Sequence, residues 1–225
     1  MSTFNLKTAF TDDQLKVIYT TGTNIIVAKP TGGENPNVAW QVFKPMQANT
    51  LTWKEEYGIY ASTSQIVNGA KLSQLSRVPV GAIQNKLYTL ESNATISGPA
   101  SGGAPDSYAL ENKYAERPYM TVGLFQDANV NGTEIAGNAV SAVPVLLAST
   151  AIMTPFTTVY IWLQSQVTSN TVITTVTSPM TQLRFGGGVD TISVKYDSST
   201  GRFIPAGENA RSLDASLIRH IDPSL

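Results

Sequence analysis

The stretch from Thr50 to Ala61, TLTWKEEYGIYA, carries the pattern that decides the fold class. Every second residue belongs to one face, which would carry Leu51, Trp53, Glu55, Tyr57 and Ile59. The opposite face would carry Thr52, Lys54, Glu56, Gly58 and Tyr60. Because successive side chains of a β-strand point to opposite sides, this alternation predicts a half-buried strand.

Similar runs rich in Val, Ile, Thr, Tyr and Trp recur along the chain, separated by Gly, Pro, Asn and Asp about every ten residues. The further predicted strands are Leu15 to Ala28, Val38 to Lys44, Lys86 to Ile96, Tyr119 to Gln126, Thr157 to Val167, Thr171 to Thr177 and Thr191 to Tyr196. This spacing predicts an all-β fold, an antiparallel β-sandwich, with a distorted barrel as the second choice.

One hairpin is specified locally. The strand-like runs Ser193 to Tyr196 and Arg202 to Ile204 flank a five-residue connection, Asp197 to Gly201, which ends in the residue that tolerates positive φ. We therefore expect a tight antiparallel hairpin here.

At most one or two short helices are expected. Thr11 and the two aspartates after it favour a capped first turn from Thr11 to Lys16. Ser212 to His220 is the second candidate, because its apolar residues share a helical face before Pro223. The glycine- and proline-rich segments Gly98 to Pro105 and Gly186 to Gly188 are expected to be loops.

Length and composition set outer limits. The chain has 225 residues, no cysteine and a formal net charge of -1. All-β domains often reach this size as one unit, so we expect a single domain over residues 1–225. No stretch concentrates Lys and Arg, which argues against a nucleic-acid partner. The first residues include Asp12 and Asp13 where a signal peptide needs an apolar core, so we expect a cytoplasmic protein or one released without a classical signal peptide.

The strongest anomaly is a stretch without Asp, Glu, Lys, Arg or His from Ile135 to Leu183. A transmembrane helix is not expected, because Pro144 and Pro155 interrupt the apolar residues. Three interpretations stay open. Val159 to Leu163 could form a central strand buried on both faces, part of the stretch could form a subunit interface, or two strands joined at Thr168 to Asn170 could insert into a membrane as a hairpin.

The sequence predicts no catalytic constellation, no metal site and no cofactor. With no cysteine and one histidine, His220 near the chain end, cysteine and histidine metal sites and most nucleophilic dyads lack their residues. We interpret His220 as a surface residue. Glu55 and Glu56 are adjacent and would point to opposite faces, so they cannot bracket one bond, whereas a pair such as Glu55 with Asp127 stays open.

Aromatic rings beside amides and carboxylates are the best candidates for recognition, because sugars and lipid headgroups bind to such surfaces. The candidate ligand-binding residues are Trp40, Asn49, Trp53, Glu55, Tyr57 and Tyr60. The alternative interpretation is that the Trp and Tyr residues belong to the core and to cross-strand pairs.

The composition, without Cys and rich in Thr, Asn and Gly, with no leader visible, is similar to that of several fungal and bacterial defence lectins and cytolysins, and it also resembles that of some capsid or shell proteins. We therefore expect a non-catalytic, self-associating protein, a homo-oligomer that binds a glycan or lipid headgroup. The alternatives are a structural assembly subunit without a ligand and, third, a carboxylate-dependent glycosidase-like enzyme.

Overall fold

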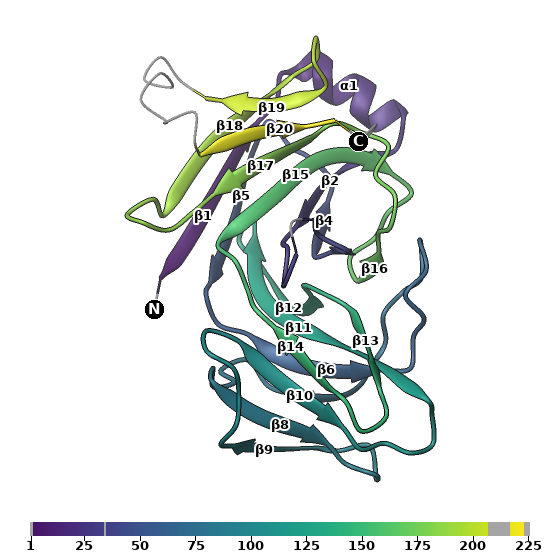
Figure 1. Cartoon of the computed structure of the whole chain (residues 1–225). Helices are drawn as coiled ribbons and strands as arrows, with labels where there is room; N and C mark the ends of the chain where they lie inside the picture. Colours follow the sequence, from purple (N-terminus) through teal and green to yellow (C-terminus); the bar gives the residue numbers. More distant parts are fainter. Residues whose placement is uncertain (1, 34, 207–216, 223–225) are drawn as a thin grey trace.

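The computed structural model describes residues 2–33, 35–206 and 217–222 and confirms an all-β fold (Figure 1). The first half of the chain forms β1 (Thr3–Ala9), α1 (Asp12–Thr20), β2 (Thr23–Ala28), β3 (Val38–Ala39), β4 (Gln41–Phe43), β5 (Ala48–Lys54), β6 (Gly58–Ser62), β7 (Gln74–Val78), β8 (Lys86–Leu90), β9 (Ile96–Ala100) and β10 (Tyr108–Asn112). The second half forms β11 (Tyr119–Val130), β12 (Thr133–Ala139), β13 (Val143–Leu146), β14 (Thr150–Met153), β15 (Thr158–Ser165), β16 (Thr171–Val172), β17 (Met180–Arg184), β18 (Thr191–Asp197), β19 (Arg202–Pro205) and β20 (Ile218–Ile221).

One long sheet organises the molecule. Seven of its nine strands follow the order β19-β18-β1-β5-β11-β6-β7, and the other two, β12 and β13, pair with β11. A five-stranded sheet has the order β20-β17-β15-β2-β4, and a four-stranded sheet has the order β14-β10-β8-β9. Most pairings are antiparallel, as predicted, but β1 with β18 and β8 with β10 are parallel. In the described part of the chain the sheets do not close into a barrel.

The core lies between these sheets. Its main cluster joins Leu6 and Leu51 of the long sheet to Ile25 and Ile161 of the five-stranded sheet. The same cluster continues through Leu124 to residues of the four-stranded sheet such as Leu90 and Leu110. The long sheet therefore supplies a face to each smaller sheet. Figure 1 shows β8, β9 and β10 at one end of the molecule and β15, β17 and β20 at the other.

The uncharged stretch contains a strand buried on both faces, as the first interpretation predicted. In β15, Val159 and Ile161 belong to the main cluster, whereas Tyr160 and Trp162 belong to a second cluster on the other side of the sheet. Ile173 and Met180, from the chain that follows β15, pack in this second cluster. Because neither face of the segment from Val159 to Leu163 meets water, a charged residue has no favourable position there.

The membrane hairpin is contradicted by the pairing. β15 lies between β17 and β2, and Thr171 and Val172 pair with β3 instead of with β15. No helix in the described ranges is long and apolar enough to cross a membrane.

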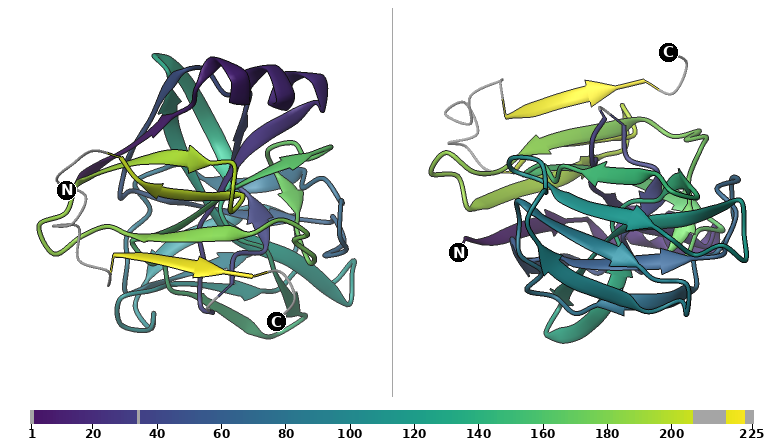
Figure 2. Two further views of the ribbon diagram at one scale, coloured as in Figure 1. Left: turned by 90° about the horizontal axis from the view of Figure 1, so that it is seen from above. Right: turned by 60° about the horizontal axis from the view of Figure 1, so that its bottom comes forward.

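Helix α1 confirms the capping prediction and corrects a strand. Thr11 caps the helix, and its hydroxyl and the Gln14 side chain form a reciprocal capping box. The helix continues to Thr20 and lies at one end of the strands (Figure 2). The strand predicted from Leu15 to Ala28 is therefore wrong before Thr23, because Leu15 and Ile18 are three residues apart and bury one helical face.

Several element boundaries also differ from the predictions. The hairpin from Ser193 to Ile204 is confirmed, with Gly201 at φ +69°. The loop expected at Gly186 to Gly188 is confirmed, and it forms a tight turn in which Gly186 and Val189 exchange backbone hydrogen bonds. Gly98 lies inside β9 instead of in a loop, and the run from Lys86 to Ile96 is broken by a turn after Leu90.

Three further segments correct the sequence predictions. The run from Thr50 to Ala61 is two strands joined by Glu55, Glu56 and Tyr57. In the run from Thr171 to Thr177, only Thr171 and Val172 are in a strand. The helix predicted from Ser212 to His220 is wrong from Ile218 onward, because this segment forms strand β20, which pairs with β17. Residues 212–216 of the predicted helix lie outside the described residues.

Candidate functional site

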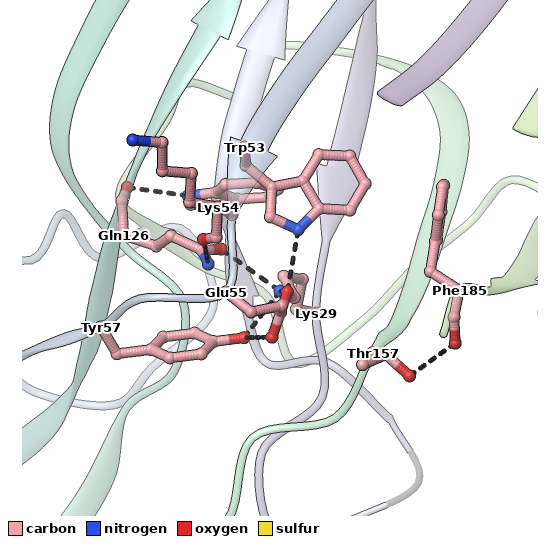
Figure 3. Close-up of polar contacts among 9 residues, drawn as sticks. Lys29, Trp53, Lys54, Glu55, Tyr57, Gln126, Thr157 and Phe185 are labelled. Atoms are coloured by element: carbon pink, nitrogen blue, oxygen red, sulfur yellow. Dashed lines mark hydrogen bonds and ion pairs between the residues drawn. The ribbon is translucent and has the colours of Figure 1, made fainter. Parts of the chain in front are cut away.

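A buried ammonium group is the most unusual feature of the core. Lys29 follows β2 directly, and its side chain is completely buried. Its Nζ donates to Glu55 Oε1 at 2.7 Å, to the Tyr57 hydroxyl at 2.7 Å and to Gln126 Oε1 at 3.2 Å (Figure 3). These three acceptors match the three protons of an ammonium group, so the buried charge is fully hydrogen-bonded.

Three aromatic rings complete the surroundings of Lys29. Its Nζ lies 5.6 Å from the ring centroid of Trp40, 5.5 Å from that of Trp53 and 5.0 Å from that of Tyr57. A cation within about 6 Å of a ring is attracted by the negative face of the π-system. We call Lys29, Trp40, Trp53, Glu55, Tyr57 and Gln126 together the Lys29 cluster.

The break between β5 and β6 positions the cluster. Trp53, Glu55 and Tyr57 are separated by single residues and point to the core side, as the alternation predicted. Both oxygens of Glu55 are held by its neighbours: Trp53 Nε1 donates to Oε1 at 2.9 Å and the Tyr57 hydroxyl donates to Oε2 at 2.8 Å. The carboxylate therefore has a fixed orientation toward Lys29.

Gln126 reaches the cluster from β11. Its side-chain Nε2 donates to the backbone carbonyl of Lys54 at 2.5 Å, and its backbone carbonyl accepts from Trp40 Nε1 at 3.2 Å. Gln126 thus links β5, β11 and the segment after β3. The register of β11 with β12 shifts between Gln126 and Ala128, a β-bulge. Bulges redirect side chains, and here Gln126 is buried whereas Asp127 is exposed.

Burial dominates the electrostatics of the Lys29 cluster. Removal from water lowers the pKa of Lys29, against the opposing effect of the Glu55 carboxylate. Burial, and then the same carboxylate, raise the pKa of Tyr57 well above its ordinary value. The pKa of Tyr108, which packs edge-on against Tyr57, is raised to about 12, again chiefly by burial. Tyr57 therefore keeps its proton and remains a hydrogen-bond donor to Glu55.

A groove of about 320 Å³ lies beside the cluster, where β5 and β11 meet. It is lined by Thr3, Thr52, Trp53, Lys54, Glu56, Val80, Asp127, Ala128, Asn129 and Glu134. Trp53 and Ala128 are buried, so the exposed lining comes mainly from the polar residues. Asp127 accepts from the Gly137 backbone at 2.7 Å, and Glu134 accepts from Asn129 Nδ2 at 2.8 Å.

Four of the six residues predicted for ligand binding belong to the Lys29 cluster: Trp40, Trp53, Glu55 and Tyr57. The other two lie elsewhere. Tyr60 donates to the carbonyl of Ser141 at 2.6 Å, and Asn49 donates to Thr8 and to the Met46 carbonyl. All except Glu55 are buried, so they do not form the surface that the prediction required. Their burial agrees with the alternative interpretation of core and cross-strand residues.

Sequence reasoning missed Lys29, Gln126 and the exposed carboxylates of the groove. The available signal for Lys29 was its place directly after the apolar run from Ile25 to Ala28. Glu55 and Glu56 do diverge, as predicted: Glu55 contacts Lys29, whereas Glu56 lines the groove. Asp127 lines the groove but Glu55 does not. The groove therefore does not bring together the carboxylate pair of Glu55 and Asp127 that the sequence analysis left open.

His220 is exposed on β20, which agrees with its interpretation as a surface residue. Within the described residues, no group of three or more His, Cys, Asp or Glu side chains is placed to hold a metal ion.

Comparison of the chain with protein-family models, with curated proteins and with solved structures gives no match.

Proposed function

We propose that this protein is a non-catalytic binding protein whose groove between β5, β11 and β12 takes a polyhydroxylated ligand, a glycan. The observation that supports this most directly is the bulge in β11, which exposes Asp127 beside Glu134 and Glu56 at one groove. Carboxylates accept hydrogen bonds from sugar hydroxyls, while the amide of Asn129 and the ammonium of Lys54 donate to them.

The charges of the groove favour a glycan over a phospholipid headgroup. Three carboxylates, Glu56, Asp127 and Glu134, face one ammonium, that of Lys54. A phosphate would meet net repulsion here, whereas a neutral or amino sugar would not. The preferred ligand is therefore an uncharged or amine-bearing sugar.

Asp127→Asn is expected to weaken glycan binding by roughly ten-fold or more, because a hydrogen bond to a charged group contributes about 1.5 to 3 kcal/mol. A glycan array on the wild-type protein identifies the ligand, and titration calorimetry with that ligand compares the variants. Asp106→Asn is the matched control, because Asp106 is exposed and lies outside the groove lining. Binding that is absent across the array, or equal for wild type and Asp127→Asn, would contradict the proposal.

Exposed apolar side chains favour a second function, self-association. Leu146 is 63% exposed and Ile152 is 58% exposed, and Leu147 and Phe156 are also exposed. All four belong to one 11-residue segment of the uncharged stretch, from Leu146 to Phe156. Leu146 lies on β13, Ile152 lies on β14, and the other two flank these strands. We propose that this segment contacts a second copy of the chain, since interface cores are depleted in charge.

Ile152→Lys is expected to shift the solution mass from an oligomer toward the monomer, because it would bury an unpaired ammonium in the contact. Light scattering over a range of protein concentrations measures this mass. Val17→Lys is the control, because Val17 is 65% exposed on α1 and outside this segment. A wild-type monomer at every concentration would contradict self-association, and an Ile152→Lys oligomer as stable as wild type would place the contact elsewhere.

A further inference from the structure

We propose that Lys29 and Gln126 become joined by an isopeptide bond, formed by the folded chain itself with Glu55 as the proton carrier. Nζ of Lys29 lies 3.2 Å from Oε1 of Gln126, and the amide carbon Cδ is bonded to that oxygen. The amine thus contacts the oxygen of the amide whose carbon it would attack, in a buried site. Reactions between groups held in such contact gain a large advantage over the same reaction in solution.

Glu55 is placed to move the protons. Its Oε1 lies 2.7 Å from Nζ of Lys29, and the hydrogen bonds from Trp53 and Tyr57 fix its orientation. Lys29 first gives one proton to Glu55 and becomes a neutral amine. Burial lowers the pKa of Lys29, which favours this form.

The bond changes balance without a co-reactant. The lone pair of Nζ attacks Cδ of Gln126 and forms the new Nζ–Cδ bond. Glu55 gives its proton to Nε2 and takes a second proton from Nζ, after which the Cδ–Nε2 bond breaks. Ammonia leaves and carries the remaining proton away as ammonium. One amide is exchanged for another, so no oxidant, reductant or water is consumed.

The surroundings favour this exchange over hydrolysis. Lys29 is completely buried and Gln126 nearly so, and Trp40, Trp53 and Tyr57 surround the amine, so water has little access to the amide carbon. Nε2 is held by the Lys54 carbonyl at 2.5 Å, which fixes the amide plane. Glu55 keeps 18% of its side-chain surface exposed, so the buried site borders solvent on the side of this carboxylate.

The product would be a covalent link between the two layers of the sandwich. Lys29 directly follows β2 of the five-stranded sheet, and Gln126 belongs to β11 of the long sheet. The link would close a loop of nearly a hundred residues, which restricts the unfolded chain in the same way as a disulfide. A chain without cysteine would thereby gain a permanent cross-link.

The intact mass of the purified, denatured chain tests the proposal. The expected mass is lower than the sequence mass by one ammonia molecule, and proteolysis should release one branched peptide that contains Lys29 and Gln126. Glu55→Gln and Lys29→Arg are expected to keep the full mass, and circular dichroism shows whether each variant is folded. Gln182 is an internal control, because it is also buried but its amide donates to the Tyr160 hydroxyl; it should stay in a linear peptide. If folded wild type keeps the full mass after prolonged incubation, or if the ammonia loss maps to another site such as Asn131–Gly132, the proposal is wrong.

Discussion

Trp162→Ala is expected to lower the free energy of unfolding by about 3 to 5 kcal/mol, the usual cost of removing a large aromatic side chain from a core. Trp162 has no exposed surface and lies in the second cluster, which also contains Tyr160 and Ile173. Its Nε1 donates to Gln164 at 2.8 Å, so the substitution also removes the partner of that amide. Urea denaturation followed by circular dichroism measures the loss.

Phe156→Ala, measured at a protein concentration at which the chain is monomeric, is the matched control, because this aromatic residue lies in the same uncharged stretch but is 43% exposed. Its effect on the free energy of unfolding should stay below about 1 kcal/mol, as for most surface substitutions. Similar losses for both variants would mean that the second cluster does not stabilise the five-stranded sheet as its packing indicates.

The contrast between these residues shows where sequence reasoning succeeds. A continuous apolar run such as Val159 to Leu163 predicts burial on both faces, because charge must be excluded from both. The hairpin from Ser193 to Ile204 was predictable for a similar reason, since its turn is specified by five adjacent residues. In both cases the residues that predict the structure are the same short segment that forms it.

The helix-or-strand choice was harder. Leu15 and Ile18 fit a helical face, but β-branched residues occur both at the end of α1 and throughout β2. The composition therefore does not indicate where the helix ends and the strand begins. For Ile218 to Ile221, the pairing with β17 outweighs the helical spacing of the apolar residues. Pairing between strands that are distant in the sequence cannot be predicted from the residues of one segment alone.

The Lys29 cluster could be predicted only in part. The alternation from Leu51 to Ile59 correctly placed Trp53, Glu55 and Tyr57 on one side. It could not supply their partner, because Lys29 precedes Glu55 by 26 residues and Gln126 follows Lys29 by 97. The exposure of Asp127 depends on a bulge, which is a property of strand pairing rather than of composition.

Glu55→Ala is the substitution that should separate the two adjacent glutamates. Relative to wild-type chain that has not yet formed the proposed cross-link, it leaves the Lys29 ammonium buried without its carboxylate, and we expect the free energy of unfolding to fall by about 3 kcal/mol, the lower end for a broken buried ion pair because Glu55 is 18% exposed. Relative to cross-linked wild type the loss would be larger, because the covalent link is missing as well. The indole N–H of Trp53 also loses its acceptor. Urea denaturation at neutral pH measures the change.

Glu56→Ala is the control for Glu55→Ala, since Glu56 lines the groove and contacts neither Lys29 nor Trp53 through any hydrogen bond found in the described residues. It should leave stability within about 0.5 kcal/mol of wild type, the usual range for such surface changes, while weakening glycan binding. Equal stability losses for the two variants would remove the special role assigned to Glu55. If Glu55→Ala is destabilised but Glu56→Ala binds the glycan as tightly as wild type, then the buried cluster stabilises the fold as argued and the groove is not the binding site. The two substitutions thus test the structural and the functional assignments independently, although their positions are adjacent in the chain.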